Sequence, residues 1–248
     1  MISVHIADTK IEWSCPENPQ ALLESVGLNE FRLKKPCEKR IAFIEAELRT
    51  LENSFQAELA FIANFTHRIF WLESNEEKAL GSAGFYEVPH GTFFSDLAMF
   101  SIPPEIIVPK EHARYAILEN LYHEALHHQM HGIEKNLNQG YLQNDCITIP
   151  TITLSWRDRT FTLLEALHAL HVYAYVTPLR RHYSVMINHT NDTIKKSIQD
   201  GLRMWQDLTS VLNAHLPKFK DPWSSYIIEW ELQLKKFTHE EYIHGSQL

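Results

Sequence analysis

The sequence predicts a mainly α-helical protein with a small β component, folded as a single compact domain. Apolar residues recur at three- and four-residue steps between Cys37 and Phe70, which is the pattern of amphipathic helices. A second apolar stripe covers residues 116–126, and Gly132 is the expected end of that helix. Between Phe85 and Ile107 turn residues alternate with short apolar runs, which favours one or two strands.

The same patterns divide the chain into three expected parts. Residues 1–80 form a helical N-terminal part, 81–180 the core with the candidate site, and 181–248 a helical C-terminal part. The remaining helices are expected at Gln20–Val26, from Phe161 to Tyr175 with Pro178 ending or kinking the helix, at Asn191–Leu212, and at Trp223–Phe237.

Composition and charge exclude several classes of function. A formal net charge of −8 argues against a general nucleic-acid binder, which needs a basic face. No apolar run reaches the length of a membrane span, and Met1–Asp8 lacks the features of a secretory leader. The three cysteines are odd in number and far apart, which fits a reducing compartment. We therefore expect a cytoplasmic protein that binds neither membranes nor nucleic acid.

The central motif is His-Glu-x-x-His, formed by His123, Glu124 and His127. Residues four apart lie on the same face of a helix, so both imidazoles can bind one metal ion while Glu124 lies at the rim of the site. The surrounding apolar stripe places the motif on a partly buried helix, which makes a metal site more credible than the pattern alone.

Two histidines need at least one more protein ligand to hold a metal tightly. The helix after Trp156 offers Glu165, His168 and His171. Glu165 gives the two-histidine, one-carboxylate set of many zinc peptidases and iron oxygenases, whereas His168 gives a three-histidine site. Spacing does not choose between them.

Three stretches together resemble a known family, the His-Glu-x-x-His type 2-oxoglutarate-dependent peptide β-hydroxylases, which modify ribosomally made peptides. The resemblance covers about Leu118–Tyr175. It is carried by Leu121-Tyr122-His123-Glu124-x-x-His127, by Ser155-Trp156-Arg157-Asp158-Arg159, and by Leu167-His168 with Tyr173-Ala174-Tyr175.

The resemblance implies that His123, His127 and His168 bind Fe(II). It also implies that 2-oxoglutarate and O₂ are co-substrates and that a side chain of a ribosomally made peptide is hydroxylated. A fixed cation must hold the distal carboxylate of 2-oxoglutarate, and arginine suits this because its planar fork binds carboxylates bidentately. Arg157 is the first candidate and Arg159 the second, with Arg180 behind them, and Trp156 is a candidate apolar wall.

Two other interpretations remain open. In a zinc metallopeptidase, Glu124 would be the general base for water attack on a peptide bond, whereas in an oxygenase it would chiefly orient groups around the site. In a helical scaffold the histidines would be incidental. For either enzyme, we expect an extended peptide to dock along the strand predicted near Thr92–Phe100.

Overall fold

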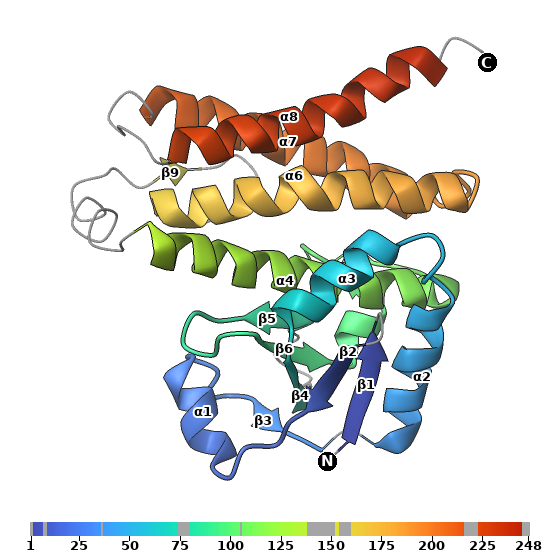
Figure 1. The fold of residues 1–248 in the computed structure, drawn as a ribbon, viewed down its shortest axis with the longest axis vertical. Helices are drawn as coiled ribbons and strands as arrows, with labels where there is room; N and C mark the ends of the chain where they lie inside the picture. The colour runs from blue at the N-terminus through green and yellow to red at the C-terminus, as the bar shows by residue number, and fades with distance from the viewer. Residues whose placement is uncertain are drawn as a thin grey trace. The chain divides into compact units, whose positions relative to one another are not determined.

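The computed structural model describes residues 2–6, 9–35, 37–73, 80–104, 106–137, 152–153, 160–215 and 223–244. The chain is mainly helical with a small sheet component, as predicted (Figure 1). It divides into two compact units, Met1–His131 and Gly132–Leu248. The division falls within one continuous helix, α4 (Ala113–Asn136), and not in a linker, so the single domain stays a prediction.

Six strands of the first unit form one sheet in the order β1-β2-β4-β6-β5, with β3 also paired to β4. Neighbours β2, β4 and β6 are parallel, whereas β1, β3 and β5 are antiparallel to their partners. Strand β5 therefore ends the sheet on one side. The strands are β1 (Ile2–Ile6), β2 (Thr9–Trp13), β3 (Arg32–Leu33), β4 (Arg68–Glu73), β5 (Ser82–Gly84) and β6 (Gly91–Ser95).

The two central strands are buried because parallel strands are covered on both faces. Every residue of β6 is buried, and so are Ile69–Leu72 of β4. At the start of β6, a Cβ added to Gly91 would lie 2.6 Å from Val88 Cγ1 and 2.8 Å from Phe70 Cε2. This close approach requires glycine at that position.

Three helices of the first unit precede the motif helix. They are α1 (Pro19–Ser25), α2 (Glu38–Arg49) and α3 (Gln56–Phe65). Helices α2 and α3 both pack against β1, and α1 packs against β3 (Figure 1). The helices predicted at Gln20–Val26 and between Cys37 and Phe70 are thus present, but β4 begins at Arg68 within the second stretch, and four strands of the sheet lie in residues 1–80.

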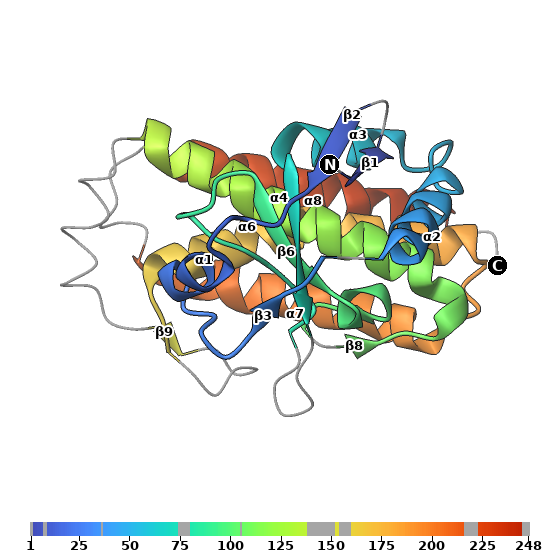
Figure 2. The same ribbon diagram turned by 90° about the horizontal axis from the view of Figure 1, so that it is seen from below.

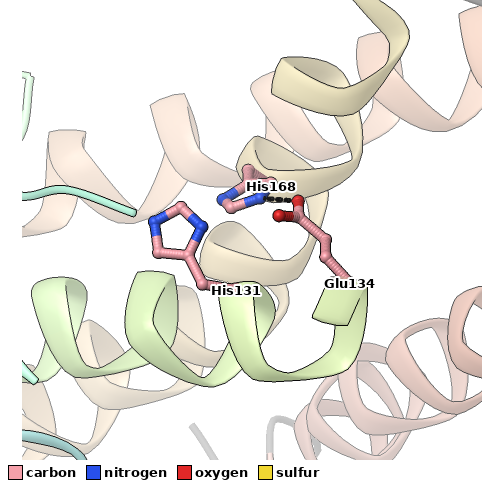
Figure 3. A group of neighbouring side chains, drawn as sticks. All are labelled: His131, Glu134 and His168. Carbon is pink, nitrogen blue, oxygen red and sulfur yellow. Dashed lines mark hydrogen bonds and ion pairs between the residues drawn. The ribbon is translucent and has the colours of Figure 1, made fainter. Parts of the chain in front are cut away.

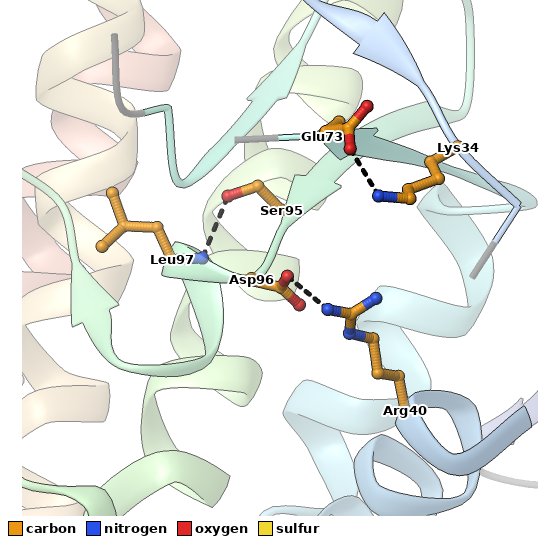
Figure 4. A network of polar contacts seen from close by, with 6 residues as sticks. All are labelled: Lys34, Arg40, Glu73, Ser95, Asp96 and Leu97. Carbon is orange, nitrogen blue, oxygen red and sulfur yellow. Dashed lines mark hydrogen bonds and ion pairs between the residues drawn. The ribbon is translucent and has the colours of Figure 1, made fainter. Parts of the chain in front are cut away.

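Polar contacts join the connections around the sheet (Figure 4). Arg40 Nη2 of α2 donates to Asp96 Oδ2 at 2.7 Å, and Lys34 pairs with Glu73 at the end of β4. The Lys34–Glu73 pair contributes little to stability, because both side chains are about half exposed and water screens their attraction.

The segment after β6 differs from its prediction. Residues Leu97–Met99 form a short 3-10 helix, η1, instead of continuing the strand. A two-stranded sheet of β7 (Ser101–Ile102) and β8 (Ile106–Ile107) follows, and then a second 3-10 helix, η2 (Lys110–His112), leads into α4.

Helix α4 is anchored in the first unit by its own polar side chains. Asn120 Nδ2 lies 3.0 Å from the carbonyl oxygen of Ala98 and 2.6 Å from that of Ser101, which ties the helix to the segment after β6. The helix continues to Asn136, so the predicted end at Gly132 is wrong. A glycine inside a helix costs only about 1 kcal/mol relative to alanine, which is too little to end a well-packed helix.

The second unit is built around α6, which packs against both α7 and α8 (Figures 1 and 2). The predicted helices at Asn191–Leu212 and Trp223–Phe237 are confirmed. Helix α6 continues through Pro178, so of the two predicted outcomes, an end or a kink, the end is wrong. Flanking Thr177 and Leu179 are buried, and this packing offsets the lost backbone hydrogen bond. The elements are α6 (Leu163–Met186), α7 (Asp192–His215), α8 (Trp223–His244), and the paired strands β9 (Ile152–Thr153) and β10 (Thr160–Phe161).

Among the described residues, no helix has both the length and the apolar character that a membrane crossing requires.

Candidate metal centre

His123 and His127 lie one turn apart on α4, and both rings are half-buried. Their Nε2 atoms are 3.2 Å apart. Two nitrogens bound to one metal at about 2.1 Å, at an angle of about 90–110°, are about 3.0–3.4 Å apart. The pair therefore fits one divalent ion, although a hydrogen bond between the two rings has the same length.

Glu124 points to the edge strand and is 3% exposed. Ser82 Oγ donates to its Oε1 at 2.7 Å, and the backbone N–H of Gly84 also donates to the carboxylate. Burial raises the pKa of Glu124 to about 7, and these two hydrogen bonds only partly oppose the rise. Glu124 is thus held against β5 by neutral donors.

The space between α4 and β5 is filled closely at this point. A Cβ on Gly84 would lie 3.1 Å from Glu124 Oε2 and 3.3 Å from His128 Cε1. His128 is itself 4% exposed, and burial lowers its pKa to about 3, so the ring is neutral. The absence of a side chain at Gly84 lets the helix approach the strand.

The three candidates for a third ligand have different surroundings in the second unit. Glu165 forms a capping box with Thr162 at the start of α6: Thr162 N donates to Glu165 Oε2 at 2.7 Å, and Glu165 N donates to Thr162 Oγ1 at 3.2 Å. His168 pairs through Nε2 with Glu134. His171 is 1% exposed and packs against the rings of Tyr175 and Trp230.

Glu134 was not predicted from the sequence as a ligand. It lies three residues after His131 on the unbroken helix α4, so the helix places these two side chains on one face. His131, Glu134 and His168 each offer a ligand atom, and these atoms lie within 4.8 Å of one another (Figure 3). Among the described residues this group could hold a metal ion. An imidazole at i and a carboxylate at i+3 on the motif helix were the sequence signal for it.

Four further residues were predicted to line the site or to bind 2-oxoglutarate. Trp156, Arg157 and Arg159 lie outside the described residues. Arg180 is 1% exposed and its Nη1 donates to the carbonyl oxygen of Ser197 at 2.9 Å, which joins α6 to α7. That contact gives Arg180 a structural role within the helical unit.

Comparison of the chain with family models finds no match, and comparison with curated proteins finds none either. The resemblance to the peptide β-hydroxylases therefore rests on the motifs of the sequence, and the function rests on the chemistry of the residues.

Proposed function

We propose that this chain is an Fe(II)- and 2-oxoglutarate-dependent oxygenase that hydroxylates a side chain of a ribosomally made peptide. The observation that carries the proposal is the arrangement at α4: His123 and His127 converge on one point while the intervening Glu124 is turned to Ser82 and Gly84. A carboxylate held in this way suits the orienting role expected of it in an oxygenase.

Each residue then has a defined task. His123 and His127 hold the metal. The sequence resemblance implies His168 as the third ligand, and Glu165 and His171 are the other candidates. Arg157 binds the distal carboxylate of 2-oxoglutarate, with Arg159 as the second candidate. With iron and 2-oxoglutarate bound, the centre would supply the activation of O₂ that the transfer of one oxygen atom requires. Glu124 keeps α4 in place against β5.

The peptide is expected to lie along a different strand from the one first predicted. Strand β6, within the predicted docking segment Thr92–Phe100, is paired with β4 on one side and β5 on the other, so it has no free edge. The edge strand is β5, whose Ser82 and Gly84 contact Glu124. An extended peptide that adds to this edge would compete with Glu124 for the backbone N–H of Gly84, and its other backbone hydrogen bonds would tolerate varied side chains.

The test is turnover of 2-oxoglutarate. Purified protein supplied with Fe(II), ascorbate, O₂ and an extended peptide should form succinate, and the peptide should gain one oxygen atom. Arg157→Ala should raise the 2-oxoglutarate concentration needed by roughly a hundredfold, because a charge-assisted bidentate contact is lost. Zinc-dependent cleavage of the peptide, without 2-oxoglutarate consumption by the iron-loaded protein, would contradict the proposal.

A zinc metallopeptidase is the second candidate, because the His-Glu-x-x-His motif taken alone is used most often in that class of enzyme. The carboxylate of Glu124 directly follows a metal-binding histidine in the chain and also contacts the edge strand, so it lies close to where a peptide would bind. In a peptidase, Glu124→Gln should abolish turnover while the metal is retained. In the oxygenase the same variant should lose only part of its activity, and the wild type should leave peptide bonds intact.

A further inference from the structure

We propose that His131, Glu134 and His168 bind a second divalent transition-metal ion, distinct from the ion assigned to His123 and His127. Two imidazoles and one carboxylate are a common ligand set for Zn²⁺ and for Fe²⁺, with a remaining position for water or a ligand. The inference rests on the proposed function only for the ion at His123 and His127. It assigns His168 to the second ion, so the third ligand of the first ion would then be Glu165 or His171.

The Glu134–His168 pair is the core of this site. The two side chains come from α4 and α6 and are joined through Glu134 Oε1 and His168 Nε2 (Figure 3). They are only 10% and 11% exposed. A carboxylate so far removed from water needs a cation or several donors to offset its lost hydration. A bound metal ion would supply that charge, and His131 would add a third ligand atom.

The geometry of α4 keeps the two proposed sites apart. At about 100° per residue, Glu134 falls about 20° from His123 around the helix, so all the proposed ligands of α4 follow one stripe. Along the axis, however, the midpoint of His131 and Glu134 lies about 11 Å from the midpoint of His123 and His127, at 1.5 Å per residue. One ion cannot be shared over that distance, so the stripe carries ligands for two ions.

The proposed ligands lie on two regular helices, His131 and Glu134 on α4 and His168 on α6. His168 lies on the second turn of α6, whose start is fixed by the Thr162–Glu165 capping box. The next turn carries His171, which is 1% exposed and has no hydrogen-bond partner on either ring nitrogen among the described residues. Ligands on well-formed helices keep their positions when the ion is absent, which favours binding.

The test is a Zn²⁺ titration of metal-free protein in competition with a chromophoric chelator. The wild type should bind two ions per chain. Glu134→Gln, which preserves side-chain size, should lower the affinity for one ion at least about tenfold, and His131→Ala should act similarly. His182→Ala, an exposed histidine on the same helix as His168, is the matched control and should change neither ion.

The outcomes separate this inference from the proposed function. If His123→Ala loses one ion while Glu134→Gln loses the other, both sites exist. If the wild type binds one ion that Glu134→Gln and His131→Ala remove but His123→Ala does not, the site at Glu134 exists and the proposed active site fails. If Glu134→Gln and His131→Ala both keep the wild-type stoichiometry and affinity, with unchanged circular dichroism, the second site does not exist and Glu134 merely pairs with His168.

Discussion

Glu124 and Glu134, two of the largely buried carboxylates of helix α4, lie ten residues apart, and their partners differ in kind. Glu124 receives hydrogen bonds from the hydroxyl of Ser82 and the backbone of Gly84, which are neutral. Glu134 instead faces the imidazole of His168, with His131 one turn away on the same helix. Neutral donors leave most of the desolvation cost in place, whereas an imidazole can carry charge or share a metal ion. Burial alone therefore does not define the role of a carboxylate on this helix.

The largest expected effect is on the pH dependence of folding stability, which in the metal-free protein should follow from the neutral surroundings of Glu124. Its pKa of about 7 in the folded chain is above its ordinary value of 4.5, so the folded state holds a proton that the unfolded state has lost. This stabilisation is complete below about pH 4.5 and disappears as the pH rises through 7, a change of about 3 kcal/mol.

Glu124→Gln should remove that dependence. Urea unfolding at pH 4.5, 6 and 8 should show the stability of the wild type falling relative to the variant as the pH rises. Taking the difference between the two proteins cancels the opposite contribution of neutral, buried His128, whose lowered pKa makes the fold less stable in acid. A difference independent of pH would show that Glu124 is ionised or has a charged partner.

The second-largest effect on stability is expected where β5 approaches α4 closely, at Gly84. Gly84→Ala places a methyl group 3.1 Å from Glu124 Oε2 and 3.3 Å from His128 Cε1, so the helix and the strand must separate by a few tenths of an ångström. We expect a loss of about 1–3 kcal/mol in the free energy of unfolding, measured by chemical denaturation. Unchanged stability together with unchanged activity would show that this contact does not position Glu124.

The hydroxyl of Ser82 should have a smaller effect. Ser82→Ala removes a donor to Glu124 Oε1 without adding bulk, and we expect a loss of about 1–2 kcal/mol at neutral pH. Because that hydrogen bond lowers the pKa of Glu124, its removal should also move the pH dependence of stability upward. Ser82→Thr, which keeps a hydroxyl, is the matched control for the hydrogen bond. A pH profile identical in Ser82→Ala and wild type would contradict this role.

The smallest effect concerns the turn of α4 that leads to Glu134. Gly132 is exposed, and an added Cβ would meet nothing within 4 Å. Gly132→Ala should therefore stabilise the protein by about 0.5–1 kcal/mol through helix propensity. The same substitution thus has opposite signs at Gly84 and Gly132, and thermal unfolding of both variants compares the two regions directly. Destabilisation by Gly132→Ala would show that this turn is constrained.

The local patterns of the sequence predicted the helices better than the sheet. The period of apolar residues located α2, α3, α4, α6, α7 and α8, because each helix buries one face of its own segment. Strand β4 was not predicted. Its buried run Ile69–Leu72 has no alternation of apolar and polar residues, and its partners β2 and β6 are distant in the sequence. The edge position of β5 likewise depends on pairing that no local pattern contains.

The candidate site was predictable where its residues share one turn. His123 and His127 follow from spacing alone, and the structure brings their Nε2 atoms to 3.2 Å. The Glu134–His168 pair joins residues 34 positions apart, so only their three-dimensional packing identifies it. The burial of Glu124 depends in the same way on β5, which precedes it by about 40 residues.

The most direct test of the account counts the metal ions bound by the purified wild type, His123→Ala and His127→Ala, and measures succinate formation by each. Removing one imidazole takes away a bond and the geometry of the pair, so both variants should lose the ion of this centre and all turnover. Retention of wild-type metal content and 2-oxoglutarate turnover by either variant would contradict the central claim that this histidine pair is the metal centre of an enzyme.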